Sequence, residues 1–144
     1  ASFLDLFSGS GAIGIEALSR GAAEAVFVEN AAECQKVIQA NLMHTKLQGR
    51  ARLLQTDVLF ALDRLAAEGK KFDIIFMDPP YEAGLYTSVL ERIAENGLLK
   101  AEGYLIAEGS SQIALTIPKG MKILREKVYK TTTLTFLCAE EENV

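Results

Sequence analysis

The regular alternation of short apolar runs with amphipathic stretches is the feature that most limits what this chain can fold into. Stretches with helical spacing of apolar residues, such as Leu59, Leu62 and Leu65 after the N-cap candidate Asp57, lie between runs that resemble strands. Those runs are 3–7, 25–28, 52–55, 72–77 and 104–107. Because strand–helix alternation builds right-handed βαβ units, the pattern predicts a parallel sheet with helices on both faces.

The end of the chain departs from this alternation. The runs 121–129 and 133–138 have no helical pattern between them and are expected to pair antiparallel. We therefore predict an α/β fold with a mostly parallel seven-stranded sheet and a C-terminal antiparallel hairpin. A length of 144 residues is enough for one domain with its own core, so we assign residues 1–144 to a single domain.

A glycine-rich loop follows the first predicted strand. Gly9, Gly11 and Gly14 match the pattern G-x-G-x-x-G between a strand and a helix. Glycine permits a tight turn and lets a ligand touch the backbone. The loop indicates a dinucleotide or a methyl donor as ligand, and a glycine-rich turn without a ligand remains an alternative.

Acidic residues recur where ligands bind an open α/β sheet, at the carboxyl ends of strands. Glu29 ends the second predicted strand, Asp57 follows the third and Asp78 follows the fourth, while Asp5 lies just ahead of the glycine loop. Asp and Glu make up 19 of 144 residues, so an acid at all four places is unexpected by chance. Acids are also common as caps and turn formers, which is the structural alternative.

Each of these acids suits one part of S-adenosylmethionine. Glu29 follows Gly9 by 20 residues, where an acid that binds both ribose hydroxyls belongs. Asp57 can accept from an adenine amino group, and Asp5 can hold the amino group of a methionine moiety, directly or through water. Since the NAD fingerprint does not require an acid at Asp5, the set favours S-adenosylmethionine over NAD.

The tetrapeptide Asp78-Pro79-Pro80-Tyr81 carries the most chemical information. Two consecutive prolines exclude a regular strand or helix interior and predict a rigid, extended turn. It places a carboxylate, a backbone carbonyl and an aromatic ring side by side, as needed to hold an exocyclic amino group of a planar base. The alternative is a proline-rich turn with a buried tyrosine. Tyr86 fits the acceptor side of the pocket and the core equally well, and Glu108 fits a cap better than the cleft, so neither is included in the predicted site.

Together these motifs resemble the N-specific, S-adenosylmethionine-dependent methyltransferases of the Rossmann-like class I fold. The stretch 4–22 and the later Asp-Pro-Pro-Tyr resemble one family closely, the bacterial small-subunit (16S) ribosomal RNA guanine-N2 methyltransferases of the RsmD type. The resemblance implies Asp78, Pro79 and Tyr81 as catalytic residues, with no metal. It implies a donor site formed by Asp5, Phe7, Ser8, Gly9, Ser10, Gly11, Glu29, Asp57, Val58 and Asp78.

Members of that family begin with an extra basic, partly helical segment ahead of the first strand. This sequence opens two residues before its first predicted strand, so the resemblance implies an N-terminally truncated chain whose missing part carries RNA contacts. The implied partner is ribosomal RNA, either naked or within a small-subunit assembly particle. Rival interpretations are a DNA adenine-N6 or cytosine-N4 methyltransferase, a protein glutamine methyltransferase, an NAD-dependent oxidoreductase and a non-catalytic nucleotide-binding module.

Composition limits the alternatives further. The chain is 49% hydrophobic and 24% charged, as is usual for a soluble globular protein, and has no run of about 20 apolar residues that could span a membrane. Two cysteines interpreted as reduced thiols indicate a cytoplasmic protein, and the lack of an apolar stretch suited to an interface favours a monomer. Cys34 and Cys138 lack metal or redox spacing, and the lone His44 argues against a catalytic histidine. A net charge of −4 argues against binding nucleic acid over the whole surface. The charge is uneven, however, because one short basic stretch contains Lys119, Lys122, Arg125, Lys127 and Lys130. This stretch is either a local surface for nucleic acid or the solvated face of an edge hairpin.

Overall fold

A computed structural model describes residues 1–78, 83–110 and 116–140. The strands are β1 (Ser2–Leu6), β2 (Glu24–Val28), β3 (Ala51–Leu54), β4 (Phe72–Met77), β5 (Leu99–Ser110), β6 (Met121–Tyr129) and β7 (Thr132–Ala139). The helices are α1 (Ala12–Ser19), α2 (Ala32–Thr45), α3 (Val58–Ala67) and α4 (Ala83–Glu95), with a 3-10 turn at Gln48–Arg50.

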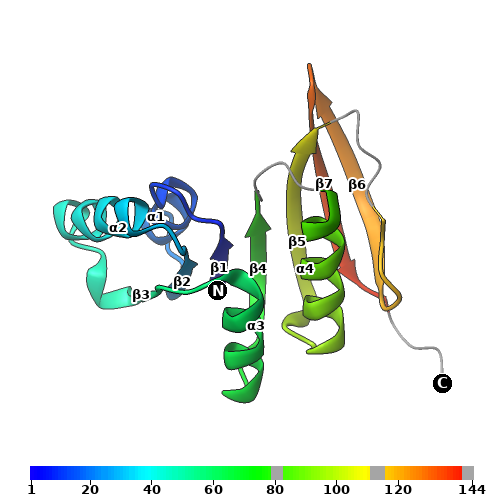
Figure 1. Cartoon of the computed structure of the whole chain (residues 1–144), viewed down its shortest axis with the longest axis horizontal. Helices are drawn as coiled ribbons and strands as arrows, with labels where there is room; N and C mark the ends of the chain where they lie inside the picture. Colours follow the sequence, from blue (N-terminus) through cyan, green and yellow to red (C-terminus); the bar gives the residue numbers. More distant parts are fainter. Residues whose placement is uncertain (79–82, 111–115, 141–144) are drawn as a thin grey trace.

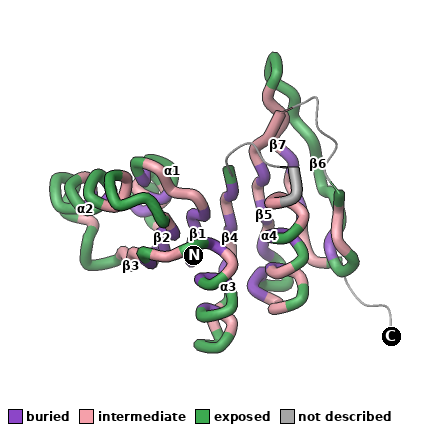
Figure 2. Tube along the Cα trace, in the orientation of Figure 1, coloured by how far each residue is buried: buried purple, intermediate pink, exposed green. Residues whose placement is uncertain are grey.

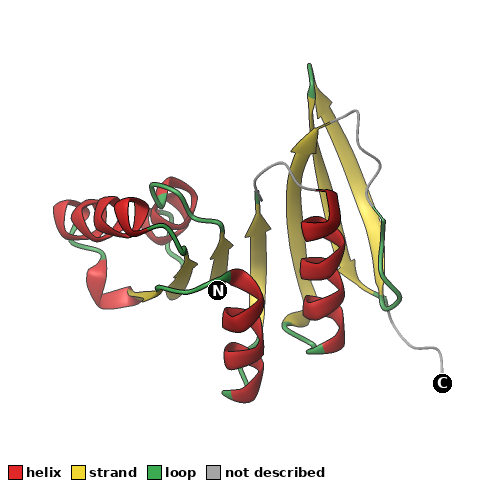
Figure 3. Cartoon of the chain, in the orientation of Figure 1, coloured by secondary structure: helices red, strands yellow, loops and turns green. Residues whose placement is uncertain are grey.

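The seven strands form one sheet in the order β3-β2-β1-β4-β5-β7-β6. Strands β1 to β5 pair parallel, and β7 pairs antiparallel with both β5 and β6. The predicted parallel sheet and its terminal hairpin are therefore confirmed (Figures 1 and 3). The chain order reverses between β1 and β4, which is where an open α/β sheet forms a ligand-binding crevice beyond its carboxyl ends.

Helices cover both faces of the sheet, as predicted. Because side chains alternate along a strand, Leu4 and Leu6 of β1 pack into one core with α3 and α4, whereas Phe3 packs into a second core with α1 and α2. Figure 2 shows buried segments concentrated in the strands, and exposed segments along α2 and β6. The same alternation turns Asp5 toward the α1 side of β1, beneath the glycine loop.

The helical stripe predicted after Asp57 is confirmed in α3, whereas α2 buries only part of its apolar surface. Leu62 and Leu65 of α3 are fully buried, as the spacing predicts. In α2, Ile38 is buried, but Val37 is 45% exposed because only a narrow side of that helix meets the sheet. Helix α4 ends at Glu95, and Gly97 follows with a left-handed φ of 60°.

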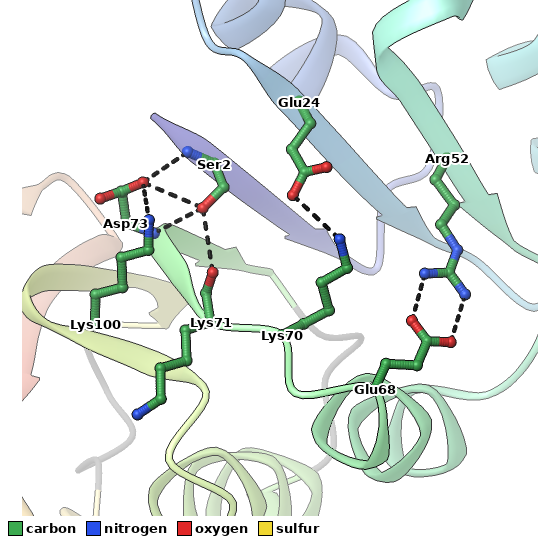
Figure 4. Close-up of polar contacts among 8 residues, drawn as sticks. All are labelled: Ser2, Glu24, Arg52, Glu68, Lys70, Lys71, Asp73 and Lys100. Atoms are coloured by element: carbon green, nitrogen blue, oxygen red, sulfur yellow. Dashed lines mark hydrogen bonds and ion pairs between the residues drawn. The ribbon is translucent and has the colours of Figure 1, made fainter.

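The amino ends of the strands are joined by a layer of ion pairs and hydrogen bonds (Figure 4). Arg52 makes two contacts with Glu68, at 2.6 and 2.8 Å. Asp73 accepts from the backbone N–H of Ser2 at 2.7 Å and from Lys100 Nζ at 3.0 Å. These contacts hold the pKa of Glu68 and of Asp73 at about 2, well below the usual range for each. Acids at this end of the sheet are thus matched by neighbouring donors and cations.

Candidate functional site

The loop between β1 and α1 makes a tight reversal at the carboxyl edge of the sheet. Phe7, Gly9 and Gly11 have positive φ values of 60°, 57° and 80°. The Gly11 N–H donates to the Ser8 carbonyl at 2.8 Å, and the Ser8 hydroxyl donates to the Asp5 carbonyl at 2.7 Å. A non-glycine residue in the left-handed region is rare and strained, and such residues gather at binding sites. Phe7 is therefore held in a left-handed backbone conformation at the start of the loop.

The third glycine of the pattern serves packing. A Cβ added to Gly14 would lie 2.3 Å from Cε2 of Phe27, a fully buried ring on β2. Helix α1 can approach the sheet this closely only because Gly14 has no side chain. The sequence pattern indicated a ligand-binding loop, and the structure gives this glycine a helix–sheet contact instead.

Gly14→Ala is accordingly expected to lower the free energy of unfolding by about 3 kcal/mol, since overpacking of a buried contact forces the backbone or the ring to move. Chemical denaturation of purified protein measures this change. Gly49→Ala is the control, because an added Cβ there meets nothing within 4 Å, and its expected effect is below about 0.5 kcal/mol. Equal stability of the two variants would contradict the packing role of Gly14.

Glu29 is tied to the glycine loop by its carboxylate. One oxygen accepts from the Gly9 N–H at 2.8 Å and the other from the Ala31 N–H at 3.0 Å. The Gln35 side-chain amide donates to the Glu29 carbonyl at 2.9 Å and so fixes the turn between β2 and α2. Ser10 is linked to α2 through its carbonyl, which accepts from Asn41 Nδ2 at 3.0 Å. The predicted residues Gly9 and Glu29 are therefore in direct contact.

Asp57 caps α3, as its sequence position predicted. Its Oδ1 accepts from the Phe60 N–H at 3.0 Å. It also lines a cavity of about 190 Å³ together with the predicted residues Phe7, Glu29 and Val58. Sequence reasoning did not include the other lining residues, which are Val28, Asn30, Thr56, Leu59 and Leu85. The sequence could have indicated these residues only by their position next to the predicted acids or, for Leu85, by its position in the apolar pattern of α4.

Asp5 is almost fully buried, with 2% of its surface exposed. Its Oδ2 accepts from the Gly14 N–H at 3.1 Å, at the first turn of α1. Burial is the main cause that raises the pKa of Asp5 to about 7, and the carboxylates of Glu29 and Asp78 raise it further. Asp5, Glu29 and Asp78 thus share one electrostatic environment, although they are far apart in the sequence.

Asp78 is exposed directly after β4. Burial, followed by a side-chain hydrogen bond and the charge of Asp78, raises the pKa of Glu108 on β5. The Tyr86 hydroxyl donates to the main-chain carbonyl of Glu108, and burial followed by the Asp78 charge raises the pKa of Tyr86 to about 12. Sequence reasoning placed Glu108 and Tyr86 outside the site, and only the pairing of β4 with β5 brings them to it. Pro79, Pro80 and Tyr81 lie outside the described residues.

The acids at the carboxyl edge differ from those at the amino edge in their partners. Within residues 1–78, 83–110 and 116–140, no salt bridge joins Asp5, Glu29, Asp57 or Asp78 to a lysine or arginine. Their carboxylates accept mainly from backbone N–H groups instead, and the Ser8 hydroxyl also hydrogen-bonds the Asp5 carboxylate. An acidic crevice without built-in cations suits a ligand that carries positive charge.

The basic stretch lies on the edge strand β6 and the turns beside it. All five of its cations, Lys119, Lys122, Arg125, Lys127 and Lys130, are exposed. The Arg125 guanidinium lies 5.5 Å from the centre of the Phe136 ring, and Lys127 Nζ lies 5.0 Å from that of Tyr129. Cations interleaved with aromatic rings on an exposed strand form a surface that suits a phosphate backbone.

Two further features are absent from the described part of the chain. No helix there combines the length and apolar character needed to cross a membrane. No group of three or more His, Cys, Asp or Glu residues there is arranged to hold a metal ion.

The sheet order, the terminal antiparallel strand and the acidic carboxyl edge define the class I S-adenosylmethionine-dependent methyltransferase fold. A protein of Streptococcus mutans and a second one solved with SAH, both named as methyltransferases, share this fold at a TM-score of 0.78. Each is 17% identical to this chain and matches 94% of it and 44% of its own length.

The particular family follows from closer matches. The profile described as Conserved hypothetical protein 95 matches residues 1–138, so the chain belongs to this family, which is the RsmD type. Ribosomal RNA small subunit methyltransferase D of Escherichia coli (strain K12) is 36% identical over 129 residues, which cover 89% of this chain. A conserved hypothetical protein of Streptococcus pyogenes superimposes with a TM-score of 0.84 at 35% identity, covering 96% of this chain and 86% of its own.

The curated relatives are longer than the part matched here. The aligned stretch spans 67% of the length of the first relative, from Bacillus subtilis (strain 168), and 63% of the Escherichia coli protein.

Proposed function

We propose that this protein transfers a methyl group from S-adenosylmethionine to the exocyclic 2-amino group of a guanine in small-subunit ribosomal RNA. One observation carries the proposal: the exposed carboxylate of Asp78 stands at the same sheet edge as the cavity between Glu29 and Asp57. An acceptor group at Asp78 would then stand at the same crevice of the sheet as a donor pocket between Glu29 and Asp57. The names of the Escherichia coli and other RsmD-type relatives support the ribosomal substrate.

The chain's residues suit the donor from end to end. When bound, S-adenosylmethionine supplies an electrophilic methyl group on a positively charged sulfur. Glu29 would accept from both ribose hydroxyls, Asp57 from the adenine amino group, and Asp5 from the methionine ammonium. Phe7 and Val58 would enclose the adenosine in the cavity that they line. The backbone of Ser8, Gly9, Ser10 and Gly11 would lie against the methionine part.

Asp78 would orient the acceptor. The lone pair of a guanine 2-amino nitrogen is delocalised into the ring, so the nitrogen is a weak nucleophile. Asp78 and the Pro79 carbonyl would accept its two N–H groups and hold the nitrogen in line with the methyl group, while Tyr81 stacks on the extruded base. Most of the rate gain would come from this positioning and from local electrostatics. The proton would leave afterwards to Asp78 or to water.

The exposed cations of β6 support an RNA partner. Phosphate contacts supply most of the affinity for nucleic acid, and this edge offers them despite the net charge of −4. The RNA can be naked or part of a small-subunit assembly particle, and either substrate implies a cytoplasmic enzyme. These assignments rest on the resemblance and on the basic surface together.

A methylation assay tests the proposal. Full-length protein is incubated with tritiated S-adenosylmethionine and small-subunit particles, naked ribosomal RNA or duplex DNA, and the labelled nucleoside is identified by mass spectrometry. The expected product is N2-methylguanine in ribosomal RNA. Label in DNA adenine or cytosine would overturn the ribosomal substrate. Micromolar binding of NAD without binding of S-adenosylhomocysteine would overturn the methyltransferase assignment altogether.

A further inference from the structure

Two carboxyl groups stand side by side at the ends of neighbouring parallel strands. Met77 of β4 is in register with Ala107 of β5, so the next residues, Asp78 and Glu108, are adjacent at the carboxyl edge. Met77 and Ala107 both pack into the core beneath α3 and α4. Because side chains alternate, Asp78 and Glu108 project to the opposite face, which is also the face of Asp5. Burial, followed by a side-chain hydrogen bond and the charge of Asp78, raises the pKa of Glu108, which agrees with this placement of the two carboxyl groups.

The end of β5 is held in place from the other face. The Tyr86 hydroxyl, on α4, donates to the main-chain carbonyl of Glu108. A Cβ added to Gly109 would lie 2.7 Å from that hydroxyl oxygen, so the contact requires glycine at this position. The Tyr86 contact therefore fixes the backbone that carries Glu108. No cation forms a salt bridge with Glu108 in the described part of the chain, which separates it from the paired acids at the amino edge.

The Watson–Crick edge of guanine presents the complement of two neighbouring carboxylates. Its 2-amino group and its N1–H are adjacent donors, whereas the corresponding ring nitrogens of adenine and cytosine are acceptors. An ionised carboxylate only accepts hydrogen bonds, so it attracts the first pattern and repels the second. A second carboxylate, beside the carboxylate that binds the amino group, would thus favour guanine over adenine and cytosine.

We propose that Glu108 determines base specificity by accepting the N1–H of the target guanine while Asp78 accepts from its 2-amino group. This assignment rests on the proposed function, whose acceptor site it extends by one residue. Burial and the neighbouring Asp78 carboxyl raise the pKa of Glu108 in the free protein. On binding, the guanine donors would take the place of the contact between the two carboxyl groups, and a proton held between them would leave to water.

The test uses a base that keeps the 2-amino group but reverses N1. In 2,6-diaminopurine, N1 is an acceptor, so the Glu108 carboxylate, which can only accept, would find no donor there and would be repelled by N1. A site built to bond one donor rejects the analogue that lacks it by factors that reach about 10⁴. We expect the full-length wild-type protein to prefer guanine over 2,6-diaminopurine by about 100-fold in kcat/KM. The RNA carries either base at the methylated position, first mapped by mass spectrometry.

The variant Glu108→Gln offers an amide N–H that can donate to N1 of the analogue. We expect the preference for guanine to fall below about 10-fold in this variant, with binding of S-adenosylhomocysteine unchanged. Glu102→Gln is the matched control, because Glu102 is an exposed acid on the same strand, and it should keep the wild-type preference.

The outcomes separate the two proposals. A wild-type protein that methylates both bases equally, or a Glu108→Gln variant that loses both activities by the same factor, would overturn the role of Glu108 alone. The first result needs no variant, so it stands even where Glu108→Gln fails to fold. A wild-type protein that binds S-adenosylhomocysteine but makes no N2-methylguanine in any RNA would instead overturn the proposed function.

Discussion

Asp78→Ala is expected to lower the rate of methyl transfer at least about 1,000-fold and to leave the dissociation constant for S-adenosylhomocysteine within about threefold. Removing one preorganised polar group from a catalytic site typically reduces kcat by about 10²–10³. Here the loss should reach the upper end, because the carboxylate both orients the amino nitrogen and provides a route for its proton. Single-turnover methylation and calorimetric titration of the same full-length preparation measure the two quantities.

The rate of methyl transfer and the affinity for S-adenosylhomocysteine should respond differently because of the position of Asp78. It is exposed at the end of β4, and it does not line the cavity between Glu29 and Asp57. Asp63→Asn is the control, because Asp63 is an exposed acid on α3 whose contacts are to Arg92 and Asn96. The control should keep wild-type turnover. Wild-type turnover in Asp78→Ala would instead remove Asp78 from the mechanism.

Asp5→Asn is expected to weaken binding of S-adenosylhomocysteine about 30-fold at pH 8. A buried, ionised carboxylate next to a ligand ammonium loses a charge-assisted hydrogen bond when it becomes a neutral amide, and such bonds are about twice as strong as neutral ones. The wild-type affinity should also fall as the pH drops below about 7, the pKa of Asp5, because the protonated acid no longer attracts the ammonium. The variant should lack this pH dependence.

The stability of the free protein should change in the opposite sense. The folded-state pKa of Asp5 is raised from 3.8 to about 7, so the folded state binds the proton more tightly than the unfolded state. The resulting stability is fully present below about pH 4 and is lost as the pH rises toward 7, by on the order of 4 kcal/mol in total. Asparagine does not ionise, so Asp5→Asn should remove this slope and be at least as stable as the wild type at pH 8.

Denaturation at pH 5 and pH 8, for wild type and variant together, isolates the contribution of Asp5, since other titrating groups cancel in the difference. Equal slopes in the two proteins would show that Asp5 is ionised throughout this range. Equal affinity for S-adenosylhomocysteine at pH 8 would show that Asp5 does not contact the methionine part of the donor. The two measurements therefore test the burial of Asp5 and its proposed role separately.

Much of the site could be predicted because its residues directly follow strands, and each of these strands is recognisable from a local apolar run in the sequence. The glycine loop after β1 and the acids Glu29, Asp57 and Asp78 each follow an apolar run, and parallel strands bring such positions to one edge. Asp57 was predicted both as a helix cap and as a ligand residue, and the structure confirms the cap. Its role toward a ligand stays a prediction.

The position of Glu108 beside Asp78 could not be predicted from the sequence. Its place beside Asp78 depends on the pairing of β4 with β5, including a register shift between Phe72 and Ile74 that the apolar pattern does not reveal. The fifth strand was predicted only over 104–107, whereas β5 spans Leu99–Ser110. Strand ends and register depend on contacts between distant segments, so they are not encoded in the local alternation of apolar residues.

The sequence by itself determined the α/β class, the sheet with its terminal hairpin and the positions of the acids, because periodicity and turn chemistry are local. Tertiary structure alone decided that Gly14 is needed for contact with Phe27, that burial raises the pKa of Asp5, and that Glu108 meets Asp78. Each of these depends on the distance between residues from different strands or helices. Such distances are set by sheet order and packing, and no single stretch of the chain contains them.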